Sequence, residues 1–296
     1  MKPGIEQAIA KLIEAEHLPA DYAEIVDNFW RPLARMIADR AGTQSPLLVG
    51  INGAQGSGKS TACLFLRYLL EERHGLKTVI LSLDDLYATR EEREDKARTI
   101  HPLFRTRGVP GTHDVALGMK LLKDLLAGKS VNLPRFDKSV DDRADAGVPF
   151  AGPVDVVLFE GWCVGAKPMP EDRLAEPINR LEAQEDQDAI WRRHINRELA
   201  QNYAKLFRMI DLLVMLKVSD FAQVRAYRQL QEEKLAARNP GGTALLDETA
   251  LARFISHYER LTRFMLEEMP ARADVTFALD NNQKPRSLPE ILLPYS

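Results

Sequence analysis

Short aliphatic runs alternate along this chain with longer segments whose apolar residues recur at helical spacing. The runs that predict strands cover residues 47–51, 77–83, 154–162, 211–218 and 275–279. Several of these runs are apolar at almost every position, which is typical of parallel strands covered on both faces. Strands that alternate with helices predict an α/β fold with a doubly wound parallel sheet.

The two ends of the chain carry the strongest helical patterns. Apolar residues at helical spacing predict two helices within residues 5–42, separated at Pro19, and a long amphipathic helix over residues 249–269. We therefore expect a helical N-terminal extension over residues 1–44. A single domain is expected over residues 45–296.

Composition narrows the class of protein. The chain has 296 residues, of which 45% are hydrophobic, with 40 Lys+Arg against 43 Asp+Glu and a net charge of −3. The balance lacks the basic excess of nucleic-acid binders, so we expect no nucleic-acid partner. The two cysteines, Cys63 and Cys163, make no disulfide framework. Without a signal-peptide pattern or a bilayer-length apolar run, we expect a cytoplasmic protein with no membrane partner.

One motif predicts phosphate binding. Residues 53–61 read GAQGSGKST, which fits the pattern G-x-x-x-x-G-K-[ST], with a predicted strand before it and a helix-forming segment, 61–72, after it. Glycines let such a loop point its amides at phosphate oxygens, and the helix start adds positive charge. Lys59 would reach the β- and γ-phosphates, and Ser60 would bind Mg²⁺. The expected nucleotide contacts are Gly53, Ala54, Gln55, Gly56, Ser57, Gly58, Lys59, Ser60 and Thr61.

Two later strands end in carboxylates. The strand at 77–83 runs into Asp84 and Asp85, and the strand at 154–162 carries Glu160 near its end. Ligands of open α/β sheets lie at the carboxyl ends of strands. We assign Asp84 to the positioning of an acceptor hydroxyl and the uptake of its proton, and Glu160 to Mg²⁺. The alternative for either aspartate is a turn or helix cap.

Residues 84–145 form the expected acceptor-binding region. The charged segment 88–105 reads as a solvated excursion, and a stiff loop with Arg107, Thr112 and His113 follows it. Thr112 has a capping alternative, and His113 has a structural one. The segment 131–143 then brings mixed charge, which suits a small polar acid but also fits a solvated surface loop. Its candidate residues are Arg135, Asp137, Lys138 and Arg143.

A helical lid is expected over residues 220–247, after an insertion at 166–208. Arg225 and Arg228 are three residues apart and share a helix face. In a kinase, arginines at this place can close on the transferring phosphoryl group. The alternative is that both are exposed arginines without a role.

The motifs together resemble one family. The segments GAQGSGKST, SLDDLY, RGVPGTHD, LPRFDKSVDDR and VVLFEGWCVG resemble the plant-type D-glycerate 3-kinase family and its kinase-like relatives. This family lies within the phosphoribulokinase, uridine kinase and pantothenate kinase group of P-loop kinases. The similarity runs from about residue 45 to the end, and the insertion around 170–200 and the lid are not matched.

The resemblance implies a P-loop kinase fold, ATP and Mg²⁺ as cosubstrates, and phosphorylation of D-glycerate to 3-phosphoglycerate. It implies Asp84 as the base within the motif S-x-D-x-[FL]-Y, which ends at Tyr87, and Glu160 near Mg²⁺. Catalytic roles are expected for Asp84, Lys59, Arg225 and Arg228. Similarity to uridine kinases also implies that Asp137 and Arg143 belong to the acceptor site.

Two alternatives remain at this point. One is a P-loop kinase for a nucleoside, pantothenate or a sugar phosphate. The other is an ATP-binding regulatory protein. The regulatory alternative is disfavoured by the presence of Lys59, Ser60, Asp84 and Glu160. A protein that only switches between states when it binds ATP needs no base to take a proton from an acceptor hydroxyl.

Overall fold

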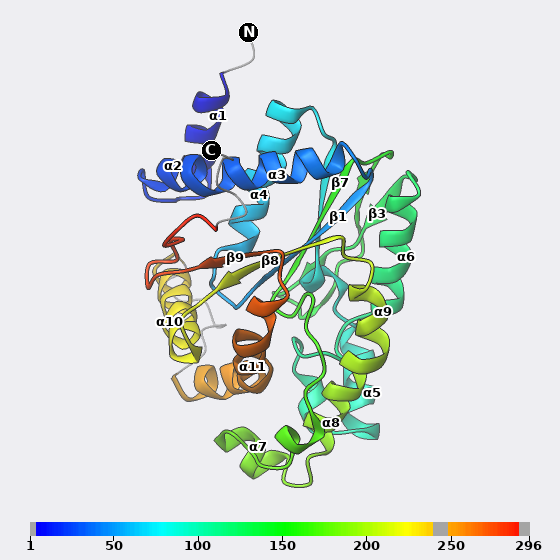
Figure 1. Cartoon of the computed structure of the whole chain (residues 1–296). Coiled ribbons are helices and arrows are strands. Elements are labelled where there is room, and N and C mark those ends of the chain that lie inside the picture. The colour runs from blue at the N-terminus through cyan, green and yellow to red at the C-terminus, as the bar shows by residue number, and fades with distance from the viewer. Residues whose placement is uncertain (1–3, 239–247, 290–296) are drawn as a thin grey trace.

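A five-stranded parallel sheet forms the centre of the protein (Figure 1). The computed structural model describes residues 4–238 and 248–289. Within these ranges it describes the side chains of all residues except 231–238 and 248. The strand order is β2-β7-β1-β8-β9, and every pair of neighbours is parallel. The strands are β1 (Leu47–Gly53), β2 (Thr78–Ser82), β7 (Val156–Gly161), β8 (Leu212–Lys217) and β9 (Val275–Ala278). The predicted α/β fold is confirmed.

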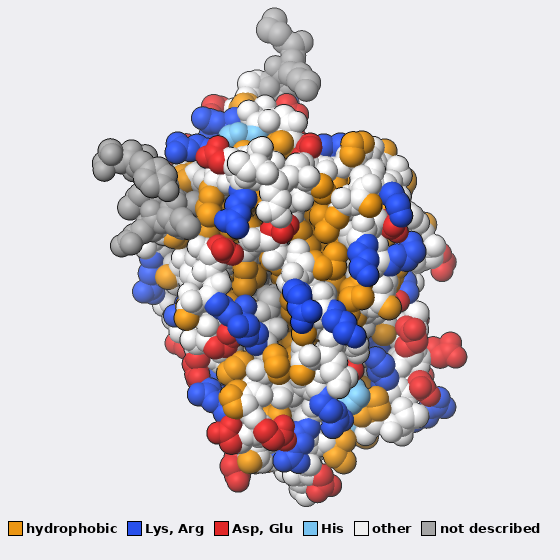
Figure 2. All heavy atoms as spheres, turned by 45° about the vertical axis from the view of Figure 1, so that its right-hand side comes forward, with side chains coloured by type: hydrophobic (Ala, Val, Ile, Leu, Met, Phe, Trp, Pro, Cys, Tyr) orange, Lys and Arg blue, Asp and Glu red, His pale blue; other side chains and the backbone are white. Residues whose placement is uncertain are grey.

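Helices cover both faces of this sheet, because its strands are apolar on both sides. Leu47 and Val49 of β1 pack into one core, and Leu48 between them packs into the other. The first core takes in α1 (Ile5–Ala15), α2 (Tyr22–Ile25), α3 (Arg31–Ala41) and α4 (Lys59–His74). The second takes in α6 (Val115–Leu126) and α9 (Ala204–Phe207). Figure 2 shows the side of α6 and α9, where basic, acidic and apolar side chains are interspersed.

The segment 88–105, predicted to be a solvated excursion, is largely exposed but is attached to the fold. It contains the helix α5 (Arg90–Thr99), which begins with a capping box between Thr89 and Glu92. Arg93 on this helix is only 1% exposed and donates to the carbonyl oxygens of Ala88, Arg105 and Asp141. The segment therefore packs through an arginine with a satisfied guanidinium, which a count of charged residues does not reveal.

The insertion adds a helical layer below the sheet in Figure 1. It contains α7 (Arg180–Glu185), α8 (Ile190–Glu198) and a π-helical turn, Leu199–Tyr203, which leads into α9. Two small antiparallel pairs lie outside the main sheet. They are β3 (Val131–Leu133) with β6 (Val148–Phe150), and β4 (Phe136–Asp137) with β5 (Asp142–Arg143).

Two long helices form the C-terminal part, α10 (Phe221–Arg238) and α11 (Glu248–Glu268). The predicted lid begins with α10, and its remainder at 239–247 lies outside the described residues. Within the described parts of the chain, no helix combines the length and apolarity that crossing a bilayer requires.

Candidate active site

The phosphate loop connects β1 to α4 and depends on two glycines with positive φ. Gly56 has φ +76° and Gly58 has φ +82°, a region that glycine enters without strain. A Cβ at Gly56 would lie 2.6 Å from Cβ of Tyr227 on α10. The loop backbone therefore approaches α10 closely and leaves its cradle free of side chains.

A carboxylate at the end of β7 faces this loop. The backbone register pairs Ile51 and Ser82 with Glu160, so the carboxyl ends of three strands meet at one edge. Ser60 Oγ donates to Glu160 Oε1 over 3.1 Å, and Lys59 Nζ lies 3.9 Å from Glu160 Oε2. Glu160 is 5% exposed, and its Oε2 accepts no hydrogen bond from the described residues. A buried carboxylate oxygen without a donor, beside a hydroxyl, fits a hard cation such as Mg²⁺.

A cavity of about 360 Å³, here called the larger cavity, opens above the loop. Its lining is polar and charged, as a bound polyphosphate would require. It is formed by Gln55, Gly56, Gly58, Lys59, Ser60, Thr61, Ser82, Asp84, Asp85, Lys138, Glu160 and Arg228.

A second cavity of about 90 Å³, the smaller cavity, adjoins the first. The two share Gln55, Lys59, Asp84, Lys138 and Arg228. The smaller cavity also has Tyr87, Arg107, Trp162, Phe254 and Tyr258. It combines one carboxylate with four cationic side chains and aromatic walls.

Asp84 is held by two side chains. Tyr87 donates its hydroxyl to Oδ1 over 2.8 Å, and Lys138 donates to Oδ2 over 2.8 Å. Burial alone would raise the pKa of Asp84, but the ammonium groups of Lys138 and Lys59 outweigh it and lower this pKa to about 2. Asp84 is therefore ionised at neutral pH.

Asp85 makes different contacts. Its carboxylate accepts from Arg135 Nη1 over 2.6 Å and from the Phe136 amide over 3.1 Å. Both partners belong to the mixed-charge segment 131–143. Asp85 thus anchors this segment beside the site, and Asp84 alone of the two lines both cavities.

Arg107 reaches the smaller cavity from the loop that follows α5. Its guanidinium forms an ion pair with Asp141 and lies 5.5 Å from the centre of the Phe136 ring. Asp141 also pairs with the buried Arg93 at 3.0 Å. The missed helix α5 therefore supports a residue of the site.

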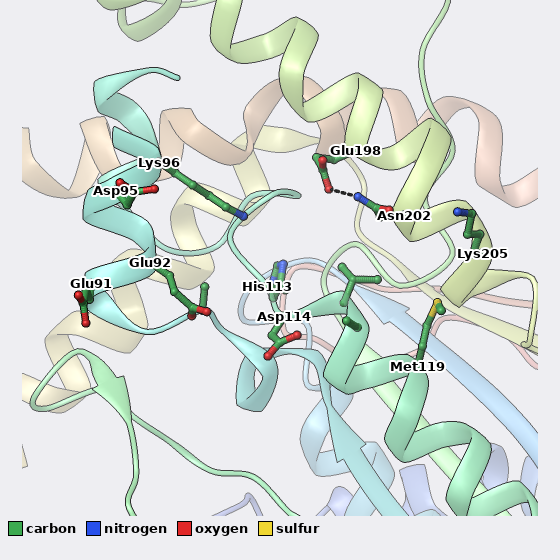
Figure 3. A pocket seen from close by; sticks show the side chains of 13 residues that line it. Glu91, Glu92, Asp95, Lys96, His113, Asp114, Met119, Glu198, Asn202 and Lys205 are labelled. Carbon is green, nitrogen blue, oxygen red and sulfur yellow. Dashed lines mark hydrogen bonds between the residues drawn. The ribbon is translucent and has the colours of Figure 1, made fainter. Parts of the chain in front are cut away.

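Two predicted acceptor residues lie elsewhere. Thr112 is fully buried, and its hydroxyl donates to Val109 O over 2.7 Å and accepts from the Gly108 amide over 2.9 Å. His113 Nδ1 lies 2.6 Å from the Tyr203 hydroxyl, and its ring stacks on Tyr87 at 4.8 Å between centroids. Neither is among the residues that line the larger or the smaller cavity, and His113 lines a separate pocket (Figure 3).

Four further candidates are not among the residues that line the two cavities. Asp137 Oδ1 accepts from the amide and the hydroxyl of Ser139, which closes a local turn. Arg143 donates to Tyr87 O over 3.1 Å, Arg135 is paired with Asp85, and Arg225 is exposed on α10. Their sequence neighbours Lys138 and Arg228 line both cavities instead.

Three residues that line the smaller cavity, and Ser82 in the larger cavity, were not predicted from sequence. Trp162 follows Glu160 and Gly161, so its place at the strand end was a usable signal. Phe254 and Tyr258 lie on α11, where their helical spacing reads as a core face. Tyr258 in fact donates its hydroxyl to Arg107 O over 3.1 Å, which fixes the loop that carries Arg107.

Comparison with known proteins places this geometry in a family, although no protein-family model matches the chain. The chloroplastic D-glycerate 3-kinase of Arabidopsis thaliana is 30% identical over 244 residues, which are 77% of this chain and 50% of that protein. The chain thus aligns with half of the plant protein's length. The uncharacterized kinase mug58 of Schizosaccharomyces pombe is 34% identical over 225 residues, 72% of this chain and 78% of that protein.

A solved structure agrees with these relatives. D-glycerate 3-kinase from Cryptococcus neoformans var. grubii matches with a TM-score of 0.75 at 26% identity, over 87% of this chain and 96% of that chain. The chain belongs to the D-glycerate 3-kinase and kinase-like family of P-loop kinases.

Proposed function

We propose that this protein is an ATP- and Mg²⁺-dependent kinase that phosphorylates D-glycerate to 3-phospho-D-glycerate. The observation that carries the proposal is the place of Asp84 in both cavities. The larger cavity contains the phosphate loop, and the smaller contains cations for an acid. A carboxylate between a phosphate site and an acid site is where a kinase positions an acceptor hydroxyl.

The size of the smaller cavity favours a small acceptor. Its volume of about 90 Å³ is roughly that of three water molecules, whereas larger ligands occupy about 300 Å³ or more. A three-carbon acid suits this space better than a nucleoside does. Arg107, Lys138 and Arg228 supply the positive charge that a carboxylate needs.

The nucleotide and metal would be held by the groups already described. The loop amides and Lys59 would bind the phosphates, and Ser60 and Glu160 would bind Mg²⁺ directly or through water. When bound, ATP and Mg²⁺ supply the transferable phosphoryl group and neutralise charge on its oxygens.

Lys138 changes partner in this proposal. In the free protein it is paired with Asp84 at 2.8 Å, with 60% of its side chain exposed. An entering acid competes for the ammonium group of Lys138. Once Lys138 turns toward the acid, the pKa of Asp84 rises from its low value, and the carboxylate becomes a better proton acceptor for the C3 hydroxyl.

α10 and α11 would exclude water from the reaction. Tyr227 of α10 packs against the loop at Gly56, and Arg228 next to it lines both cavities. Phe254 and Tyr258 of α11 close the opposite side. A dry, positively charged site stabilises the charge that develops during transfer.

A panel of acceptors tests the proposal. Purified protein with ATP and Mg²⁺ is offered D-glycerate, D-lactate, uridine, pantothenate and ribulose 5-phosphate, and products are identified by phosphorus NMR. We expect 3-phosphoglycerate from D-glycerate and no product from D-lactate, which lacks the C3 hydroxyl. Faster transfer to another acceptor would mean that the protein is a kinase whose substrate is that acceptor and not D-glycerate. ATP binding without transfer to any acceptor would contradict kinase activity.

A further inference from the structure

Three buried side chains hold the backbone around Gly108, the residue that follows Arg107. The Trp162 indole donates from Nε1 to Gly108 O over 2.8 Å, and Thr112 Oγ1 accepts from the Gly108 amide over 2.9 Å. The Tyr258 hydroxyl donates to Arg107 O over 3.1 Å. All three side chains are buried, so water does not compete for these hydrogen bonds.

The conformation of Gly108 depends on this packing. Its φ is +129°, a region that favours glycine, and a Cβ at this position would collide with the Tyr258 hydroxyl. The rings of Trp162 and Tyr258 meet edge to face, with centroids 5.0 Å apart. Because the backbone at Gly108 is fixed on both sides, the direction in which the Arg107 side chain leaves the loop is fixed as well.

Trp162 is itself tied to the strand that leads into the phosphate loop. Asn52 of β1 is 2% exposed, and its Nδ2 donates to Trp162 O over 3.0 Å and to Val164 O over 2.9 Å. β1 ends at Gly53, where the phosphate loop begins. The phosphate loop and the backbone of Trp162 therefore share one support, and the indole extends this support to the loop of Arg107.

Arg107 is the residue through which this network reaches the acid site. Its side chain is 25% exposed and lines the smaller cavity together with Asp84. The carboxylate and the reacting hydroxyl of a small acid are a fixed distance apart. A shift of Arg107 would therefore move the hydroxyl away from Asp84 and the phosphate loop, and a misplacement of about 1 Å can cost about 10²-fold in rate.

We infer that Trp162 is a positioning residue for phosphoryl transfer, which acts through Gly108 and Arg107. The indole N–H holds the loop of Arg107 at the distance from the phosphate loop that brings the acceptor hydroxyl to Asp84. This inference rests on the proposed function, because Arg107 matters for transfer only if an acid binds beside it.

A double-mutant cycle tests the inference with D-glycerate as acceptor. Trp162→Phe keeps an aromatic wall and removes the indole donor, and Arg107→Met removes the cation. We expect Trp162→Phe alone to lower kcat/KM for D-glycerate about tenfold or more and to leave the KM for ATP nearly unchanged. In the Arg107→Met background the same change should have almost no further effect, because the residue that it positions is absent.

The cycle separates positioning from the other role of the Trp162 ring, which is to form part of the cavity wall. An effect of the altered wall would persist without Arg107. Trp191→Phe is the matched control, since Trp191 is equally buried at 2% exposure and its Nε1 has no hydrogen-bond partner among the described residues. It should leave kcat/KM unchanged. Additive effects in the cycle, or no effect of Trp162→Phe, would overturn the inference.

Hydrogen exchange of the amides at 107–112 gives a readout that needs no turnover. Trp162→Phe should speed the exchange of this segment by about tenfold, because Gly108 O loses its donor, and Trp191→Phe should not. Unchanged exchange in Trp162→Phe would overturn the inference whatever the activity. If the wild type makes no 3-phosphoglycerate, the proposed function fails instead, and the cycle is run with the acceptor that the panel identifies. A wild type that phosphorylates no acceptor would overturn both.

Discussion

Lys138 and Asp84 form an ion pair of 2.8 Å although they are 54 residues apart in the sequence. The pair is partly exposed, with 60% of the lysine and 31% of the aspartate side chain accessible, so it contributes little to stability. The pair matters for substrate binding. Lys138 and Asp84 are the groups that a small hydroxy acid would contact, so the acid would have to break their ion pair to bind.

Replacing Lys138 by Met tests whether this lysine binds the acceptor acid. We expect the KM for the acceptor acid to rise about tenfold or more, because one cation for its carboxylate is lost. The KM for ATP should change less. Steady-state kinetics with each substrate varied in turn measures the difference, and an unchanged acceptor KM would remove Lys138 from the acid site.

The same variant changes the pH dependence. Lys138 lowers the pKa of Asp84, so the ionised base of the wild type persists as pH falls, and activity is lost only near the low folded pKa. Without Lys138, burial raises this pKa, and the acidic limb of kcat/KM moves to higher pH. Profiles that run from neutral pH down to the acid limit of the folded protein should show the shift. Coincident profiles would contradict Asp84 as the titrating group.

Gly56 in the phosphate loop and Gly75 at the C-terminal end of α4 form a matched pair of glycines with positive φ. Gly56→Ala places a Cβ 2.6 Å from Tyr227 Cβ at φ +76°, whereas Gly75→Ala at φ +67° meets no atom within 4 Å. Both carry backbone strain of about 1 to 2 kcal/mol. Only Gly56→Ala should also displace α10 and weaken ATP binding, as measured by nucleotide titration. Equal ATP affinities in the two variants would contradict this close approach.

Arg93 should contribute far more to stability than its exposed helix neighbour Arg98. Arg93→Met leaves three carbonyl oxygens without their donor and removes one of the two arginines paired with Asp141, and we expect a loss of about 3 kcal/mol in the free energy of unfolding. Arg98→Met removes an exposed pair with Asp95 and should cost less than about 1 kcal/mol. Urea unfolding of both variants decides between a packed and a solvated α5.

Two buried histidines predict sensitivity to acid. Burial lowers the pKa of His113 to about 3 and that of His257 to about 4, below the ordinary value of about 6.5. The unfolded chain therefore binds more protons below about pH 6.5, and stability falls as pH decreases from there toward the folded pKa values. His113→Phe should flatten the dependence of unfolding free energy on pH between about 6.5 and 5. An unchanged slope would mean that the fold does not lower the pKa of His113.

The sequence predicted the sheet well because its signal is local. Each aliphatic run became a strand within a few residues, and the helix predicted over 249–269 is α11, Glu248–Glu268. The phosphate loop was predictable for the same reason, since residue type and spacing determine its backbone. Asp84 and Glu160 followed from the rule that strand ends meet at one edge.

The direction of individual side chains was not predictable in this way. Thr112 and His113 lie in a motif of the site, yet tertiary contacts bury both side chains in the fold. Tyr258 has the spacing of a core residue, and only the packing of α11 brings it to the smaller cavity. The burial of Arg93 could not be predicted from its charged sequence neighbours, because burial of an arginine depends on carbonyl groups elsewhere in the chain.

The most direct test compares Asp84→Asn with Asp85→Asn, which differ in position by one residue. With D-glycerate as acceptor, Asp84→Asn should lower kcat by about 10² to 10⁴ and keep ATP affinity, because only the group that takes the hydroxyl proton is lost. Asp85→Asn, whose carboxylate holds Arg135 and the Phe136 amide, should lower kcat far less. A near-normal kcat for Asp84→Asn would contradict the central claim that Asp84 joins the phosphate site to the acceptor site.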